Sequence, residues 1–236
     1  MDPLTTPYCG APPLPDTVLT AWNPDPWLIA ALALGAAAAA IMPRRAAWLM
    51  GIAVLALAFV SPLCALSSAL FSARVLHHVL IVAVAAPLLV RGAGWQARGG
   101  SVAFLIHLAA IWFWHMPQPY AAALGSDGIY WLMELSLLAS ALWLWAAIRG
   151  ADRIGVAVAL SLGTLLHMGM LGALLTFAAR PMFAAHLLTT QSFGLTALED
   201  QQLAGLLMWV PAALPYVGFA VWRVWSVLGA ARPAAA

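Results

Sequence analysis

The chain has 236 residues, of which 64% are hydrophobic and 8% are charged, and its mean hydropathy is +0.94. So few polar side chains cannot cover the surface of a soluble globule, and the composition therefore predicts an integral membrane protein. The ten basic residues other than histidine are all arginines, and the formal net charge of +2 is too small and too scattered for a surface that binds nucleic acid.

Seven apolar segments follow one another along the chain. Most of them reach or approach the ~20 residues that span a bilayer as a helix, and a backbone in lipid must satisfy its own hydrogen bonds. The segments are residues 27–42, 46–66, 75–90, 101–115, 128–148, 154–178 and 202–228. The sequence therefore predicts an all-α, polytopic membrane protein, a bundle of seven transmembrane helices.

Arginines are distributed unequally between the two sides of such a bundle. One side receives Arg44, Arg45, Arg91, Arg98, Arg149, Arg153, Arg223 and Arg232. The other side receives only Arg74 and Arg180. Because cytoplasmic connections carry an excess of basic residues, this pattern predicts that the N-terminus is outside and the C-terminus is cytoplasmic. Tryptophans gather near both boundaries, as in an aromatic belt.

The expected domain organisation is simple. Residues 1–26 are acidic and proline-rich and lack a basic region followed by an apolar core, so we expect an extracytoplasmic tail rather than a cleaved signal peptide. Residues 27–228 form the membrane domain, and the outer loop 179–201 is long enough to cap it. Residues 229–236 form a cytoplasmic tail.

Most polar residues of the predicted spans converge on the outer half of the membrane. The residues in this half are His77, His78, His115, His167, Glu134 and Asp200, whereas His107 lies toward the cytoplasmic half. Ionisable residues within a membrane are costly and usually face the bundle interior or an aqueous cavity. Their convergence indicates a functional site.

Methionines follow the same gradient. His167 and Met170 are three residues apart and share a helix face, and Met168 lies between them. Imidazole with thioether sulfur is a ligand set that suits copper, Cu(I) especially. The candidate metal ligands are therefore His77, His78, His115, His167, Glu134, Met168, Met170 and Asp200.

Each of these signals also has a structural interpretation. A single membrane histidine often donates a hydrogen bond between helices, and a methionine among aliphatic residues often fills space. Glu134 can be protonated and bonded to a neighbouring helix, and Asp200 can cap the seventh helix. Cys9 and Cys64 both lie near the outer boundary, where they either form a disulfide or remain two free thiols.

Four motifs occur in order over roughly residues 70–216. They are "HHVLIVAVAAPLLVRGAG" (77–94), "WHMPQPYAAAL" (114–124), "GALLTFAARPMFAAH" (172–186) and "LEDQQLAGLLMWVPAAL" (198–214). This series resembles the CtaG family of membrane proteins linked to cytochrome c oxidase assembly, which is distinct from the single-span copper chaperones that share the name. The last motif is the most specific.

The resemblance implies a protein of the bacterial inner membrane that helps to insert copper into a haem–copper oxidase. Its implied partners are the catalytic subunit of the oxidase and a periplasmic copper chaperone. The chain matches the family pattern at His78, His115 and Asp200, while the correspondence at His167 is weaker. Arg74, Tyr130 and Glu134 stand where the family often carries histidine. Either Glu134, Met168 and Met170 replace imidazole ligands, or the site of this chain is weaker.

These observations combine into one mechanistic hypothesis. Asp200, Gln201 and Gln202 form the outward lip of a polar cavity, and the glutamines bond to neighbouring helices. The floor of the cavity consists of His78, His115, Glu134 and His167. Gly205 lets another helix approach closely, and Pro211 and Pro215 bend the seventh helix. The protein then captures copper at the outer face and transfers it to the oxidase by ligand exchange, without catalysis.

Other functions stay open at this point. A metal-free scaffold for oxidase assembly would use the polar cluster for helix contacts alone. A copper transporter would need a polar route through both leaflets, and the cytoplasmic half offers little beyond His107. A haem protein would place histidines on facing helices at matching depth. A retinal protein is excluded because the chain has no lysine for a Schiff base.

Overall fold

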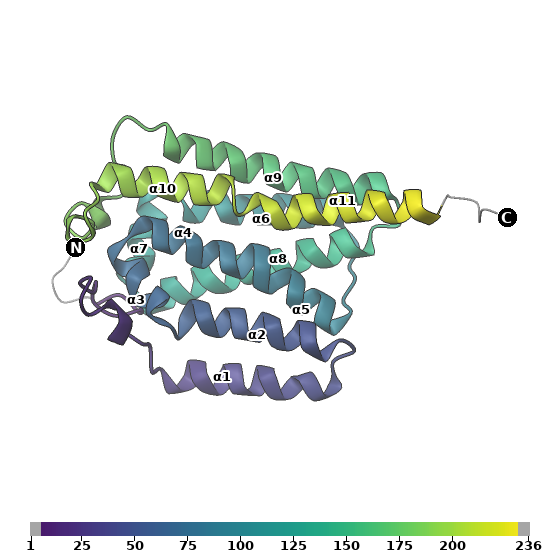
Figure 1. The fold of residues 1–236 in the computed structure, drawn as a ribbon, viewed down its shortest axis with the longest axis horizontal. Helices are drawn as coiled ribbons and strands as arrows, with labels where there is room; N and C mark the ends of the chain where they lie inside the picture. Colours follow the sequence, from purple (N-terminus) through teal and green to yellow (C-terminus); the bar gives the residue numbers. More distant parts are fainter. Residues whose placement is uncertain (1–5, 231–236) are drawn as a thin grey trace.

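The computed structural model describes residues 6–230, and every regular element in this range is helical (Figure 1). The helices are α1 (Pro26–Ala37), α2 (Arg45–Phe59), α3 (Pro62–Ala69), α4 (Phe71–Val79), α5 (Ala86–Ala93), α6 (Gly100–Trp114), α7 (Pro117–Leu124), α8 (Asp127–Gly150), α9 (Ile154–Thr176), α10 (Ala197–Trp209) and α11 (Ala213–Ala230). The predicted all-α class is confirmed. The ends of the two predicted tails, residues 1–5 and 231–236 with Arg232, lie outside the described residues.

Four to six helical stretches are long and apolar enough to cross a membrane. Four are continuous: Phe71–Ala93, Asp127–Gly150, Ile154–Thr176 and Ala197–Leu228. Two more arise if bent pairs count as single spans, α2 with α3 at 45° and α6 with α7 at 74°. The first predicted segment corresponds to a shorter apolar helix, Pro26–Ile41. The chain is thus a multi-pass helical membrane protein.

Local sequence signals explain where several helices begin. The Asp25 side chain accepts hydrogen bonds from the Trp27 and Leu28 amides ahead of α1, whose first residue is Pro26. Thr196 and Glu199 form a reciprocal capping box at the start of α10. These side chains satisfy amide donors that a helix start leaves without partners inside the helix.

The stretch Phe71–Ala93 is the central helix of the bundle. It runs through α4, the π-helical turn η3 (Leu80–Ala85) and α5, and 72% of its most apolar window is buried, against 33–56% for the other continuous spans. Figure 1 shows it between α2 and α10, and the Trp145 indole of α8 donates to the Val82 carbonyl within the π-helical turn. Polar residues on this helix are therefore the best screened from lipid.

Helices α9 and α10 pack closely because both carry glycine at the crossing. A Cβ added to Gly172 would lie 2.7 Å from the Gly205 carbonyl oxygen, and a Cβ on Gly205 would meet the α9 backbone. Neither position has room for a larger residue. The expected close helix approach at Gly205 is confirmed.

The connections α1–α2, α5–α6 and α8–α9 lie at one end of the bundle, together with the C-terminal end of α11 (Figure 1). Hydrogen bonds join them there: the Arg44 amide donates to Gly92, and the Arg223 guanidinium donates to Ala151. The N-terminal tail and the loop 177–196 lie at the opposite end. The end at which α11 finishes carries the described arginines of the predicted cytoplasmic side.

Arg74 departs from the prediction. It was expected in a connection at the outer boundary, but the central helix starts at Phe71 and includes it. Its side chain is only 1% exposed. The predicted third segment, residues 75–90, began too late. A charged residue lowers the mean hydropathy of a segment even where that residue is paired inside the bundle.

Candidate metal centre

The N-terminal tail is fastened to the bundle by a disulfide between Cys9 and Cys64, which answers the question that the sequence left open. The tail also stacks Tyr8 on Tyr130 of α8, with ring centroids 4.8 Å apart, and the Tyr8 hydroxyl donates to Asp25. Burial, together with this hydrogen bond, raises the pKa of Tyr8, and the same bond lowers the pKa of Asp25. The tail is therefore a fixed cover at the end of the bundle that was predicted to face outward.

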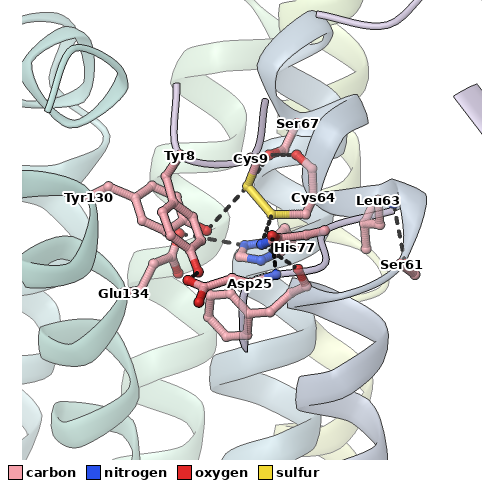
Figure 2. Close-up of a disulfide and its surroundings, with 12 residues drawn as sticks. Tyr8, Cys9, Asp25, Ser61, Leu63, Cys64, Ser67, His77, Tyr130 and Glu134 are labelled. Carbon is pink, nitrogen blue, oxygen red and sulfur yellow. Dashed lines mark hydrogen bonds and ion pairs between the residues drawn. A yellow bond between two sulfur atoms is a disulfide. The ribbon is translucent and has the colours of Figure 1, made fainter. Parts of the chain in front are cut away.

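Four polar side chains meet beneath this cover, three of them from α4. The Arg74 guanidinium lies 3.3 Å from Glu134 Oε1, His78 Nε2 lies 3.3 Å from the same oxygen, and His77 Nδ1 lies 3.6 Å from it. Each residue is at most 2% exposed. Figure 2 shows Tyr8, the disulfide, His77 and Glu134 gathered in one place. We call Arg74, His77, His78 and Glu134 the outer cluster.

The spacing of the outer cluster follows from helix geometry. Arg74, His77 and His78 are three and four residues apart, so they present their side chains on one face of α4. That face meets α8, where Glu134 projects into the bundle. Sequence reasoning found both histidines and the carboxylate but missed Arg74, although the i, i+4 spacing from His78 was a signal for it.

Several atoms of the cluster have no hydrogen-bond partner among the described residues. They are both ring nitrogens of His77, Nδ1 of His78, Oε2 of Glu134, and Nε and Nη2 of Arg74. Buried polar atoms are rarely left unpaired, and such atoms in a native site call for an ion or water. His77, His78 and Glu134 each offer a donor atom within 4.8 Å of the others. Ligands ~2 Å from one metal lie at most about 4 Å apart, so a small inward shift brings these three onto one ion.

His115 extends the cluster. Its ring centroid lies 5.5 Å from that of His78, and its Nδ1 lies 2.7 Å from the Ile111 carbonyl oxygen. A carbonyl only accepts, so Nδ1 carries the proton and the lone pair stays on Nε2. That Nε2 is buried and has no partner among the described residues. His115 thus offers a further nitrogen next to His78.

Asp200 does not line the cluster. It is fully buried and accepts hydrogen bonds from the Phe71 amide at 2.6 Å, from the Ser72 amide at 3.2 Å and from the Ser72 hydroxyl. It caps the start of α4 from the neighbouring helix α10. Its negative charge there also interacts favourably with the positive end of the α4 helix dipole. The predicted outward lip is therefore wrong: Asp200 positions the helix that carries Arg74 and both histidines.

The outer loop is tied down by two buried side chains. Gln201 accepts from the Met182 amide at 2.7 Å and donates to the Leu175 carbonyl, as expected for a side chain that bridges elements. His186 donates from Nδ1 to the Ala69 carbonyl, and the Tyr120 hydroxyl lies 2.6 Å from its Nε2. Burial lowers the pKa of His186 to about 4. The loop therefore closes over the junction of α3 and α4.

The remaining predicted ligands lie elsewhere. Met170 is 47% exposed on the outside of α9, because it follows the buried Met168 by two residues and points away from the bundle. His167 is half-buried beside Phe104 of α6. His167 and Met168 line a separate small cavity with His107. The eight predicted ligands thus divide into the outer cluster with His115, this second cavity, the capping Asp200 and the exposed Met170.

A lateral cavity of about 350 Å³ reaches the outer cluster from the side. It lies between α1, α2 and α8 and includes Asp25, Trp27 and Glu134 in its lining. Its other lining residues are mostly apolar. Glu134 is therefore accessible from the side of the bundle, between α1, α2 and α8, as well as from beneath the tail.

The fold and the cluster define a class: a multi-pass helical membrane protein with a buried histidine–carboxylate group near one end. Within that class, the chain belongs to the family of cytochrome c oxidase caa3 assembly factors, Caa3_CtaG, whose sequence model matches residues 27–98 and 100–229. Comparisons with curated proteins and with solved structures gave no match. The resemblance seen in the motifs is thereby confirmed over most of the chain.

Proposed function

We propose that this assembly factor captures copper, as Cu(I), in the outer cluster and passes it to the catalytic subunit of a haem–copper oxidase. Copper is cargo in this proposal, and the protein performs no catalytic step. The observation that carries the proposal is the set of three buried donors, from His77, His78 and Glu134, that lie within 4.8 Å of one another. His115 stands beside them to complete the ligand set.

The proposal places the chain in the bacterial inner membrane with seven spans. The short helix Pro26–Ile41 supplies the seventh span. The arginine-bearing end is cytoplasmic by the positive-inside rule, so the N-terminus and the outer cluster face the periplasm. The disulfide between Cys9 and Cys64 agrees with this orientation, because disulfides persist in the oxidising periplasm.

The chemistry of the cluster suits a transferable ion. Imidazole is a good copper ligand. Arg74 already pairs with Glu134, so an entering cation competes with the guanidinium for that carboxylate. Such competition weakens binding and favours release to a better ligand set. The site then binds copper weakly enough to release it to the oxidase.

The lateral cavity supports a transfer within the membrane. Its lining is mostly apolar and includes Glu134. A transmembrane helix of an oxidase subunit can approach such a surface without desolvating polar groups. A periplasmic copper chaperone would instead deliver copper at the outer end, where the tail covers the cluster.

A second candidate, a metal-free assembly scaffold, is favoured by one observation. The Arg74–Glu134 pair balances the buried carboxylate without any metal. In this case His78 would connect α4 to α8 through its hydrogen bond to Glu134, and the oxidase would receive its copper elsewhere.

Copper retention distinguishes the two candidates. The detergent-purified chain is loaded anaerobically with Cu(I), challenged with a Cu(I) chelator and compared with the His78→Ala/His115→Ala variant. His186→Gln is the matched control, because it changes a buried outer-end histidine outside the cluster. We expect the double variant to lose one copper equivalent per chain and the control to lose none. Equal copper in all three proteins would reject the copper proposal and favour the scaffold.

The same variants test the function in cells grown at low copper. Copper capture predicts that the oxidase assembled beside the double variant lacks copper at its catalytic centre, whereas its polypeptide still reaches the membrane. Oxidase metallation equal to wild type would contradict the proposed transfer.

A further inference from the structure

A small cavity lies between α6 and α9, apart from the outer cluster. Its volume is about 10 Å³, close to the minimum that holds a single water molecule, so it has space for one small ion. His107, His167 and Met168 line it, together with Phe104 and Thr164. Two histidines and a methionine thus line one small space at the interface of α6 and α9.

The hydrogen bonds of His107 determine which of its nitrogens is free. Its Nδ1 lies 2.9 Å from the Ser140 hydroxyl oxygen, and that hydroxyl donates its own proton to the Leu137 carbonyl at 3.1 Å. The hydroxyl must therefore accept from His107, so Nδ1 carries the imidazole proton and Nε2 keeps its lone pair. A histidine fixed in this way by its other ring nitrogen is typical of a metal ligand.

The free nitrogen has no donor to satisfy it. His107 is 1% exposed, and its Nε2 makes no hydrogen bond to any of the described residues. Thr164, the cavity residue with a hydroxyl group, donates that proton to the Leu160 carbonyl of its own helix. A buried lone pair without a donor is costly, and a cation would satisfy it.

The other two donors have the right chemistry. Met168 is only 4% exposed, so its thioether belongs to the interior, and His167 packs against Phe104 with ring centroids 5.7 Å apart. Imidazole nitrogen and thioether sulfur together select soft ions such as Cu(I). The lining contains no carboxylate, and neutral ligands in an apolar setting favour a monovalent ion over a divalent one.

We propose that His107, His167 and Met168 form a second metal site that binds Cu(I) inside the membrane domain. The site is distinct from the outer cluster: Ser140, which orients His107, follows Glu134 by six residues on α8, a distance of about 9 Å along the helix axis. The two sites share no ligand. The second site therefore goes beyond copper capture at the outer end and stands on its own observations.

A pair of methionine variants tests the site. Met168→Leu keeps the side-chain volume but removes the sulfur from the cavity. Met170→Leu makes the same change two residues away on the exposed face of α9. Both full-length proteins are purified in detergent and titrated anaerobically with Cu(I) against a chelator. We expect the Met168 variant to bind one copper equivalent at least about tenfold more weakly than wild type, and the Met170 variant to match wild type.

X-ray absorption supplies an independent readout. The outer cluster and His115 offer nitrogen and oxygen donors, so a sulfur neighbour of copper in the wild type reports the second site. That sulfur signal should vanish in Met168→Leu and persist in Met170→Leu. Identical titrations and no sulfur signal in any protein would overturn the inference and leave the cavity with a water molecule.

This experiment can reject either copper proposal independently of the other. His78→Ala/His115→Ala removes the copper that lacks sulfur, whereas Met168→Leu weakens the copper that has it. If only the first variant loses copper, the second site is rejected and the outer cluster stands. If only the second variant loses copper, the second site stands and the proposed role of the outer cluster is rejected.

Discussion

The Arg74–Glu134 pair makes the sharpest prediction about the outer cluster. Its closest atoms are 3.3 Å apart and both side chains are 1% exposed. With an effective dielectric constant of ~20, two unit charges at this distance attract by about 5 kcal/mol. Removing one partner of a buried pair leaves the other charge uncompensated and typically costs about 3–5 kcal/mol. Arg74→Gln should therefore destabilise the metal-free protein by roughly this amount.

The same variant should bind copper more tightly. Without the guanidinium, the Glu134 carboxylate no longer has a competing cation, so part of the lost attraction becomes available to Cu(I). Recovery of about 1.4 kcal/mol corresponds to a tenfold gain in affinity, and we expect at least that much. Glu134→Gln should weaken copper binding, while Arg74→Gln/Glu134→Gln should recover much of the lost stability because no charge stays unpaired.

Denaturation of the metal-free variants in detergent measures the stability change, and chelator competition measures the copper affinity. Opposite signs for the two effects of Arg74→Gln are the distinctive result. If the Arg74 and Glu134 variants weaken copper binding equally, the guanidinium supports the ligand set rather than competing for it, and the reasoning fails.

Three further outcomes follow from the packing of the outer end. Asp200→Ala strands two buried amides at the start of α4 and should cost about 2–4 kcal/mol of unfolding free energy. Glu199→Ala on the same helix should cost less, because it removes only the exposed half of the capping box. Gly205→Ala should destabilise the protein by about 1–3 kcal/mol through a backbone clash, whereas Gly218→Ala, which meets nothing within 4 Å, should be neutral or stabilising. His186 has a folded pKa of about 4, below its unfolded value near 6.5. Its contribution to the free energy of unfolding is therefore complete above pH 6.5 and falls by up to about 3 kcal/mol as the pH drops toward 4. Hydrogen exchange in the outer loop should rise between pH 6.5 and 4 and stay constant above pH 6.5.

The sequence predicted the membrane class and the meeting of His77, His78 and Glu134 because both rest on strong local constraints. Apolar runs have few alternatives to membrane helices, and ionisable residues at one depth have few places to go except the bundle interior. The i, i+1 pair on α4 and the carboxylate on α8 fall at matching depth whichever way the helices rotate.

Three positions could not be predicted from local pattern. Arg74 was assigned to a connection because hydropathy counts a charge as exposed, and only the partner on α8 shows that it is paired. Asp200 caps a helix that starts 129 residues earlier than it, so its role depends on which helices become neighbours. Met170 shares a helix face with His167 in the sequence pattern, but the rotation of α9 turns Met170 outward and Met168 inward.

Charge balance explains how both candidate sites would choose their ion. In the outer cluster the Arg74 and Glu134 charges cancel. In the small cavity between α6 and α9 the lining residues carry no charge unless an imidazole is protonated. A Cu(I) ion then leaves one net positive charge in either place, while a divalent ion leaves two. Because the cost of burying charge rises steeply with its magnitude, the protein interior itself disfavours Cu(II) and Zn(II). Selection for the monovalent ion would thus come from the charge of the surroundings as much as from the ligand atoms, and replacing Arg74 with a neutral residue should relax it at the outer cluster alone.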